Sequence, residues 1–421
     1  MSAPLRDVTN GVPPALDAAV AALEPLRRTP PRAPLAARID AFEALSGSLL
    51  GQRDQSIAGS AFLAAFLRRT HIEELLGREI TDLGALDRFV AAGPRSELRI
   101  LPRGAVCQWI AGNVPLLGVF SWALSAIFGN VNLLRVSSRN EDVLSPVVVR
   151  VAELSEAGRE MAERTRVVAF ERDNAPAHAA MSRFADLRVA WGGEEAVSAV
   201  RALPARWECD DLVFGPRRSF AVIDPAVADQ RTVARLANDI VYFDQLACSS
   251  PQVVFVRGGR DDAAVARFVE QLGEALAAGV RQFRRHALDW SETYLIELDR
   301  QRAVLEGGAV MRDAATQWTL AVLERPVAQL SCANRFVQVV PFDDLATVAA
   351  ALPANVQTVV MALPESAARE AAESLGARGV CRFPRPGMGN GFEIPWDGVA
   401  VTPRFGHFVT RAIQPGERAD D

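Results

Sequence analysis

Cys248 is the residue of this chain whose surroundings best suit covalent chemistry. Its loop reads Tyr-Phe-Asp-Gln-Leu-Ala-Cys-Ser-Ser-Pro over residues 242–251, and an apolar run that predicts a strand follows directly. A thiol among small residues at such a junction is sterically open to attack a carbonyl carbon, as a nucleophilic cysteine must be. The alternative is a buried structural cysteine, the commoner fate of a lone cysteine. We expect that role for the four other cysteines, Cys107, Cys209, Cys332 and Cys381.

A second segment could complete a site of this kind. Residues 110–118, Ile-Ala-Gly-Asn-Val-Pro-Leu-Leu-Gly, follow a predicted strand and precede a long apolar run. The pattern predicts a strand, a tight turn and a buried helix, with the proline in the first helical turn. Asn113 is the uncharged amide at this turn and could donate a hydrogen bond to an oxyanion. An Asx-turn or a helix N-cap is the alternative role, and spacing alone favours it.

These two segments and three others resemble, in order, the aldehyde dehydrogenase superfamily and, within it, the bioluminescence-type (LuxC-like) fatty acyl-CoA reductases. The motifs are Gly-Asn-Val-Pro-Leu (112–116), Gly-Asn-Val-Asn-Leu-Leu-Arg-Val-Ser-Ser (129–138), Trp-Gly-Gly (191–193), Gln-Leu-Ala-Cys-Ser-Ser-Pro (245–251) and Pro-Trp-Asp-Gly (395–398). The resemblance implies an aldehyde dehydrogenase-like α/β fold: two doubly wound α/β domains with an N-terminal helical layer.

The resemblance also implies a role for each matching position. Cys248 would take the acyl group as a thioester, and Asn113 with the backbone N–H of Cys248 would form the oxyanion hole. Arg135 stands where the superfamily has a lysine that contacts the adenosine ribose. Gly192 and Gly193 stand where the backbone approaches the cofactor pyrophosphate at a helix start.

One departure from the superfamily pattern concerns the reaction. The water-activating glutamate of the superfamily is replaced by Val213, in Val-Phe-Gly-Pro-Arg over residues 213–217. An apolar side chain cannot deprotonate water, so an acyl-enzyme should hydrolyse slowly. We therefore expect exchange of the acyl group with a thiol rather than oxidation of an aldehyde to an acid.

A second departure concerns the cofactor. Members that prefer NAD carry a glutamate three residues after the ribose-contacting lysine, and Ser138 occupies that place here, between Ser137 and Arg139. Serines and arginines should accept the 2′-phosphate that a carboxylate would repel, so we expect NADPH, contacted by Ser137 and Ser138. Glu194 and Glu195 favour a helix start but could repel the pyrophosphate.

Composition excludes several function classes. The chain has 421 residues, 49% hydrophobic and 23% charged, with a formal net charge of −5, which gives no reason to expect nucleic acid as a partner. All 46 basic residues are arginine, so a pyridoxal-phosphate Schiff base and a P-loop are excluded. The scattered cysteines and four histidines predict no metal site and a reducing, cytoplasmic location.

Neither a secretory signal nor a membrane span is expected. The N-terminal residues 1–34 lack a continuous apolar stretch, and the apolar run 114–128 is shorter than the about 20 residues that cross a bilayer. A buried helix packed against a sheet accounts for that run.

Helical spacing at 14–30 and 36–93 is followed by alternating strands and helices, which predicts parallel, doubly wound sheets. We expect a helical region (1–93), a nucleotide-binding α/β domain (94–230), a catalytic α/β domain carrying Cys248 (231–400) and a tail (401–421). The expected strands are 105–110, 131–136, 166–170, 187–191, 219–223, 252–256, 336–340 and 356–361, with a strand pair in 311–322. The expected helices are 115–128, 142–160, 175–184, 194–202, 230–240, 261–287 and 343–351.

The leading hypothesis is NADPH-dependent reduction of an acyl thioester, either acyl-CoA or a carrier-bound acyl group, to an aldehyde through an acyl-enzyme on Cys248. One alternative is an acyl-phosphate reductase of the glutamyl-phosphate type. Another is a non-catalytic, acyl-transferring assembly subunit. The resemblance further implies a homo-oligomer and leaves open an acyl-activating protein partner.

Overall fold

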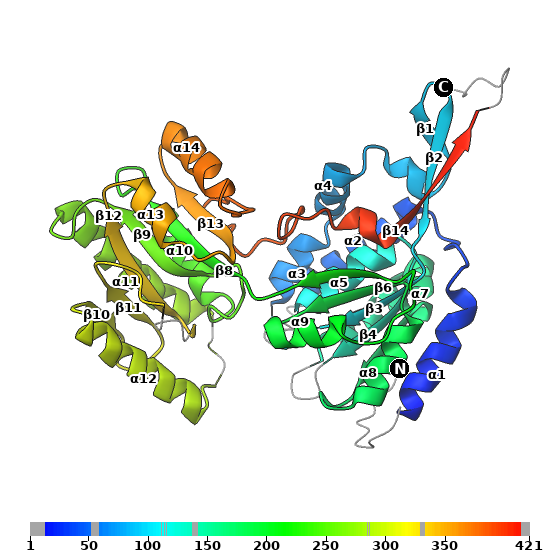
Figure 1. The fold of residues 1–421 in the computed structure, drawn as a ribbon, viewed down its shortest axis with the longest axis horizontal. Coiled ribbons are helices and arrows are strands. Elements are labelled where there is room, and N and C mark those ends of the chain that lie inside the picture. The colour runs from blue at the N-terminus through cyan, green and yellow to red at the C-terminus, as the bar shows by residue number, and fades with distance from the viewer. Residues whose placement is uncertain are drawn as a thin grey trace. The chain divides into compact units, whose positions relative to one another are not determined.

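The computed structural model describes residues 13–51, 59–110, 112, 114, 116–136, 142–283, 285, 287–328 and 333–413 (Figure 1). The chain folds as two compact units, each described by itself below. The first unit takes in the described residues up to Gly215 and again from Phe392, and the second is Pro216–Gly391. The polypeptide therefore passes between the units twice, after Gly215 and after Gly391.

The first unit is built on a five-stranded sheet in which every neighbouring pair is parallel. In spatial order its strands are β5 (Thr165–Ala169), β4 (Val131–Val136), β3 (Ala105–Trp109), β6 (Leu187–Trp191) and β7 (Asp210–Phe214). The chain winds outward from β3 through β4 to β5 and then returns to the other side of β3 for β6 and β7. The order thus reverses between β3 and β6, which is where open α/β sheets bind ligands.

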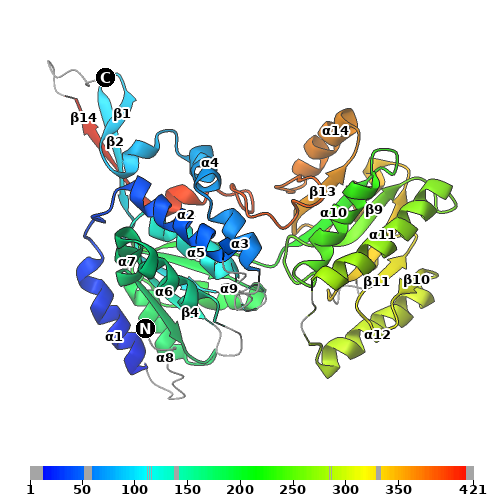
Figure 2. The same ribbon diagram turned by 180° about the vertical axis from the view of Figure 1, so that it is seen from behind.

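Helices cover both faces of this sheet (Figure 1, Figure 2). One face packs against α1 (Pro14–Leu23), α8 (Ala175–Phe184) and α9 (Glu194–Arg201). The other packs against α5 (Leu116–Ile127), α6 (Leu144–Leu154) and α7 (Glu156–Glu163), with α2 (Leu35–Gly51) outside them. The short helices α3 (Ser60–Phe66) and α4 (Arg69–Glu79) follow α2. The apolar run expected to be a buried helix is α5, which lies between the sheet and α2.

The second unit has a six-stranded sheet that is parallel except for one hairpin. In spatial order its strands are β10 (Ala309–Arg312), β11 (Thr319–Val322), β12 (Phe336–Phe342), β9 (Pro251–Arg257), β8 (Arg218–Ile223) and β13 (Val356–Ala362). One face packs against α10 (Gln230–Val241) and α11 (Ala263–Gln282). The other packs against α12 (Trp290–Leu305), α13 (Leu345–Ala351) and α14 (Glu365–Gly376).

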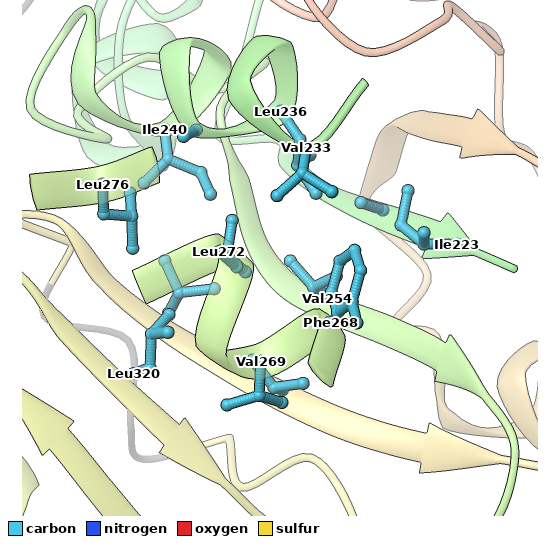
Figure 3. Close-up of a cluster of buried hydrophobic side chains, with 14 of the residues drawn as sticks. Ile223, Val233, Leu236, Ile240, Val254, Phe268, Val269, Leu272, Leu276 and Leu320 are labelled. Carbon is cyan, nitrogen blue, oxygen red and sulfur yellow. The ribbon is translucent and has the colours of Figure 1, made fainter. Parts of the chain in front are cut away.

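A cluster of buried side chains fixes α10 against α11 and the sheet (Figure 3). Leu236 and Ile240 of α10 belong to this cluster together with Phe268 and Leu272 of α11 and Val254 of the central strand β9, and all five are nearly fully buried. Burying a side chain of this size contributes about 1.5–3 kcal/mol. The cluster therefore holds the helix that leads directly into the loop of Cys248.

Three antiparallel strands form a further small sheet in the first unit: β1 (Val90–Gly93), β2 (Ser96–Pro102) and β14 (Gly406–Ala412). The sequence did not predict it, because residues 90–93 were assigned to the helical region and residues 406–412 to a tail. The two long strands, β2 and β14, pair although about 300 residues of chain separate them. The sequence of one strand therefore does not reveal its pairing with the other. The predicted tail is thus a strand over 406–412.

Other differences from the sequence-based expectation have local causes. Strand β8 pairs with β9 and β13, so the expected boundary at 230 falls inside the second unit. The expected helix 142–160 is two helices, because Ser155 adopts an extended conformation and its hydroxyl caps α7 at Gly158 N (2.9 Å). Strand β7 and helix α14 were not predicted. The α/β class with parallel sheets is confirmed.

The described helices include none that is both long enough and apolar enough to cross a membrane.

Candidate active site

Cys248 lies in the loop between α10 and β9 in the second unit, with its side chain half-buried. Its carbonyl oxygen accepts a hydrogen bond of 2.7 Å from the hydroxyl of Ser219, a fully buried residue of β8. Ser250 N bonds back to Ala247 O at 3.0 Å and closes a tight turn around the cysteine. The neighbouring strand therefore fixes the peptide unit that carries the thiol.

The beginning of this loop is held in a conformation that few residues adopt. Asp244 and Gln245 have φ values of +53° and +61°, which costs of the order of 1 kcal/mol or more per non-glycine residue. Gln245 compensates by donating from Nε2 to Pro251 O at 2.7 Å. Asp244 pairs with Arg335 at 2.6 Å, and Arg335 has no exposed surface. Burial lowers the pKa of Arg335, and the carboxylate of Asp244 opposes that shift.

The first unit contains a cavity of about 690 Å³ at the carboxyl edge of its sheet. Residues at or just beyond the carboxyl ends of β3 (Trp109, Ile110), β4 (Arg135) and β6 (Trp191, Gly192) contribute to its wall. These include the two strands between which the winding order reverses, the expected position for a ligand in this architecture. Helices α8 and α9 provide much of the remaining wall, through His178, Ala196 and Ala199 among others.

His178 forms part of the wall of this cavity. Its Nδ1 accepts a hydrogen bond of 2.9 Å from Trp109 Nε1, and its Nε2 lies 3.2 Å from Arg172 O. A backbone oxygen can only accept, so this pattern assigns the neutral ring with the proton on Nε2. Burial lowers the pKa of His178, and the nearby Arg135 lowers it further. His178 is thus an uncharged, oriented part of the cavity wall.

Arg135 points from the end of β4 toward the loop that follows β5. One of its terminal nitrogens donates to Phe170 O at 3.0 Å, and the guanidinium lies 5.6 Å from the centre of the Phe170 ring. Burial lowers the pKa of Arg135. Its buried Nε has no hydrogen-bond acceptor in the described part of the chain. Such a donor indicates a place for a ligand acceptor.

Gly192 and Gly193 bring bare backbone to the start of α9. A Cβ on Gly193 would meet nothing within 4 Å, and one on Gly192 would approach only Ala196 Cβ, at 3.1 Å. The N–H groups at the start of α9 with open backbone before them fit a pyrophosphate. Glu195 forms an exposed ion pair of 2.6 Å with Arg172. The positive charge of Arg172 therefore offsets the repulsion that the Glu195 carboxylate would exert on a bound anion.

The structure brings Arg135, Gly192 and Gly193 together around one cavity and places Cys248 in the other unit. Asn113, Ser137 and Ser138 lie outside the described residues, as does Cys332. Val213 is on β7, where it packs against the apolar cluster of the first unit.

Sequence reasoning missed His178, Trp109 and Arg172. Arg172 lies in the loop that follows β5, and a polar side chain in such a loop is the signal that could have indicated it. The bond between Trp109 and His178 joins residues 69 positions apart and leaves no local pattern.

Comparison with known proteins agrees with this architecture. Residues 45–407 match the family model described as "Acyl-CoA reductase (LuxC)". The long-chain acyl-protein thioester reductase of Photorhabdus luminescens is 25% identical over 323 residues, which cover 76% of this chain and 66% of that protein. The protein of the same name from Aliivibrio fischeri is 23% identical over 349 residues, covering 82% and 71%.

Solved structures of aldehyde dehydrogenases share the fold. The NAD-dependent aldehyde dehydrogenase of Sinorhizobium meliloti matches with a TM-score of 0.70 at 14% identity, covering 96% of this chain and 88% of that one. The indole-3-acetaldehyde dehydrogenase AldA of P. syringae, solved in complex with NAD+ and IAA, matches with a TM-score of 0.70 at 13% identity, covering 95% and 88%.

The matched region spans about two thirds of the length of the curated relatives. The family model, by contrast, matches most of this chain, from residue 45 to residue 407. On that match the chain belongs to the acyl-CoA reductase (LuxC) family.

Proposed function

We propose that this protein reduces an acyl thioester, either an acyl-CoA or a carrier-bound acyl group, to the corresponding aldehyde with NADPH. Cys248 is the nucleophile in this proposal. The observation that carries it is a half-buried thiol on a loop pinned to β8, in a chain of the acyl-CoA reductase family. Relatives named long-chain acyl-protein thioester reductases support the same substrate class.

The chemistry begins at the sulfur of Cys248. The thiolate forms a bond to the acyl carbon, the bond from that carbon to the donor thiol breaks, and the donor leaves as a free thiol. Asn113 and the backbone N–H of Cys248 are proposed to stabilise the oxyanion, and one such donor is typically worth about 10²–10³ in rate. Bound NADPH would supply the hydride that reduces the acyl carbon. The bond between that carbon and the sulfur of Cys248 would then break, which releases the aldehyde and restores the thiolate.

Val213 supports reduction over hydrolysis. It stands in β7 at the position where the resembling superfamily carries a water-activating glutamate, and it packs in an apolar cluster. A valine cannot remove a proton from water, so the acyl-enzyme should persist until hydride or another thiol reaches it.

The cavity of the first unit is the proposed site for the nicotinamide cofactor. Gly192, Gly193 and the start of α9 would hold the pyrophosphate, and Arg135 would contact the adenosine ribose. Arg135 lies in the wall of the cavity, and Arg172 of the wall pairs with Glu195. Ser138 in place of a glutamate, with Ser137 and Arg139 beside it, supports NADPH over NADH.

Two further expectations belong to this proposal. We infer a homo-oligomer, which the largely exposed strand β14 on the rim of the small sheet supports, since an open strand edge can pair with another chain. We also infer a cytoplasmic location from the scattered cysteines. An acyl-activating partner would hand over the thioester.

The test is acylation of the protein by a panel of acyl-CoAs of different chain length, without nicotinamide, followed by intact mass measurement. We expect one acyl adduct, lost in Cys248→Ala. Cys381→Ala is the matched control, because Cys381 is also a partly exposed thiol of the second unit and should not affect labelling. An adduct that persists in Cys248→Ala would contradict the proposal. The absence of any adduct, with acyl-CoA or with acyl-carrier protein, would also contradict it and would favour the acyl-phosphate alternative.

A further inference from the structure

The two residues that follow the nucleophile share one hydrogen-bond acceptor. The hydroxyl groups of Ser249 and Ser250 both donate to Oδ1 of Asn390, at 2.8 and 3.0 Å. Both serines are buried and Asn390 nearly so, which keeps water from replacing these bonds. A single side chain, 140 residues further along the chain, thus holds the downstream side of the cysteine loop.

Asn390 is held in turn by the last turn of α10. Its Nδ2 donates to Asp239 O at 2.7 Å. The carboxylate of Asp239 accepts from Gly387 N at 2.7 Å and from Gly389 N at 3.1 Å. One residue of α10 therefore fixes both the backbone before Asn390 and the side-chain amide of Asn390.

The loop that carries Asn390 is fitted closely to this carboxylate. Gly387 has a φ of +91°, which favours glycine, and a Cβ on Gly389 would lie 3.0 Å from Asp239 Cγ. Two arginines face this loop: the side chain of Arg235 lies against Gly387, and Arg382 donates to Gly389 O at 3.3 Å and Gly391 O at 2.7 Å. Burial raises the pKa of Asp239 to about 7, while the backbone N–H donors and Arg382 oppose that shift.

We propose that Asn390 is a positioning residue for Cys248, and that Asp239 sets the position of Asn390. With Ser219 on the carbonyl of Cys248, Asn390 completes a two-sided hold on the nucleophile. Without Asn390, two buried hydroxyl groups lose their acceptor, and the loop must rearrange to satisfy them. This inference deepens the proposed function and rests on it, because it assigns Asn390 a role in the reactivity of Cys248.

The test is a double-mutant cycle on the rate of reaction at Cys248. We expect Asn390→Ala to slow single-turnover acylation by hexadecanoyl-CoA by about 10- to 100-fold, as a small misplacement of a reacting group can. The concentration of thioester that gives the half-maximal rate should stay unchanged. In a Ser249→Ala/Ser250→Ala background the same substitution should change the rate by less than about twofold, because its partners are already absent. Asn355→Ala is the control, since that exposed amide of the same unit also bonds a backbone carbonyl, Pro216 O.

A second readout separates this inference from the proposed function. Alkylation of Cys248 by iodoacetamide needs no thioester chemistry, and its rate should change with Asn390→Ala and follow the same cycle. If the wild-type protein is alkylated but never acylated, the proposed function is contradicted. The alkylation rates of the variants would still show whether Asn390 positions Cys248. An Asn390→Ala protein with unchanged melting temperature and unchanged alkylation would overturn the inference. So would an effect of equal size in both backgrounds.

Discussion

Each unit buries an aspartate that joins segments distant in the sequence, but the two carboxylates have different kinds of hydrogen-bond donor. Asp186 of the first unit and Asp239 of the second are 5% and 3% exposed. Asp186 accepts from Arg27 at 2.7 and 2.8 Å, from Arg206, and from Ala105 N at 2.7 Å. Asp239 makes its carboxylate hydrogen bonds with backbone N–H groups.

The same burial therefore gives opposite pKa shifts. Burial alone would raise the pKa of Asp186, but Arg27, Ala105 N–H and Arg206 together outweigh it and lower that pKa to about 2. For Asp239 burial dominates and raises the pKa to about 7. Arg27 and Arg206 form with Asp186 a clasp that stabilises the fold, because it joins the segment after α1 to the first sheet. Backbone donors alone instead fix a geometry around a carboxylate that is costly to ionise.

The largest effect should come from removing the carboxylate of the first clasp. We expect Asp186→Ala to lower the free energy of unfolding by about 3–5 kcal/mol, because it leaves buried arginine charge without a partner. Urea unfolding with Asp17→Ala, an exposed aspartate of α1, as control would measure it. A loss of unfolding free energy below about 1 kcal/mol would mean that the arginine partners of Asp186 do not make it a stabilising group.

The second prediction concerns the carboxylate that is costly to ionise. A raised pKa means that the folded protein binds the proton more tightly, so the contribution of Asp239 to stability should fall as pH rises from about 4 to about 7. Asp239→Asn cannot titrate. The difference in unfolding free energy between the two proteins should change by up to about 1.4 kcal/mol per pH unit, in favour of the variant at higher pH. Parallel pH curves would contradict this account.

Asp186→Asn should show the opposite dependence. The lowered pKa contributes stability above about pH 4 that is lost as pH falls toward 2. The cost of the variant should therefore shrink by about 2 kcal/mol between pH 5 and pH 2. Chemical unfolding at a series of acidic pH values would measure this change. A cost independent of pH would show that the hydrogen bonds of Asp186, rather than its charge, join the segments.

The smallest effect should come from one arginine of the clasp. Arg206 is one-third exposed and Arg27 keeps its own two bonds to Asp186, so Arg206→Ala should cost about 1 kcal/mol or less. Thermal unfolding would detect the change as a small shift in melting temperature. A cost equal to that of Asp186→Ala would show that the clasp depends on Arg206 and that Arg27 cannot compensate.

Sequence reasoning placed the central strands well and the polar ones poorly. Strands β4 and β6 match their predicted bounds, because most of their residues are apolar, as expected for a parallel strand buried on both faces. Strand β7 begins with Asp210 and Asp211, which a sequence pattern assigns to a loop. The fold satisfies them with Arg404, at 2.6 Å from Asp210, and Arg188, at 2.6 Å from Asp211. Such partners come from distant segments.

The residues of the candidate site also fall into those that the sequence reveals and those that it does not. Cys248, Arg135 and the glycines before α9 stand in short motifs that a single sequence can reveal. Asn390 and Asp239 act through bonds to residues about 140–150 positions away, so no local spacing points to them. Residues 383–392 are rich in proline and glycine, which is typical of a loop, but this composition does not indicate what the loop contacts.

The polypeptide passes between the units after Gly215 and after Gly391, and each passage starts close to a group bonded to the cysteine loop. Ser219 follows the first passage and holds the carbonyl of Cys248, while Asn390 precedes the second and holds the serines beyond it. Both connecting segments are thereby bonded to the loop of Cys248. A change in the backbone of either segment would therefore reach the thiol through a few residues of backbone and one side-chain hydrogen bond.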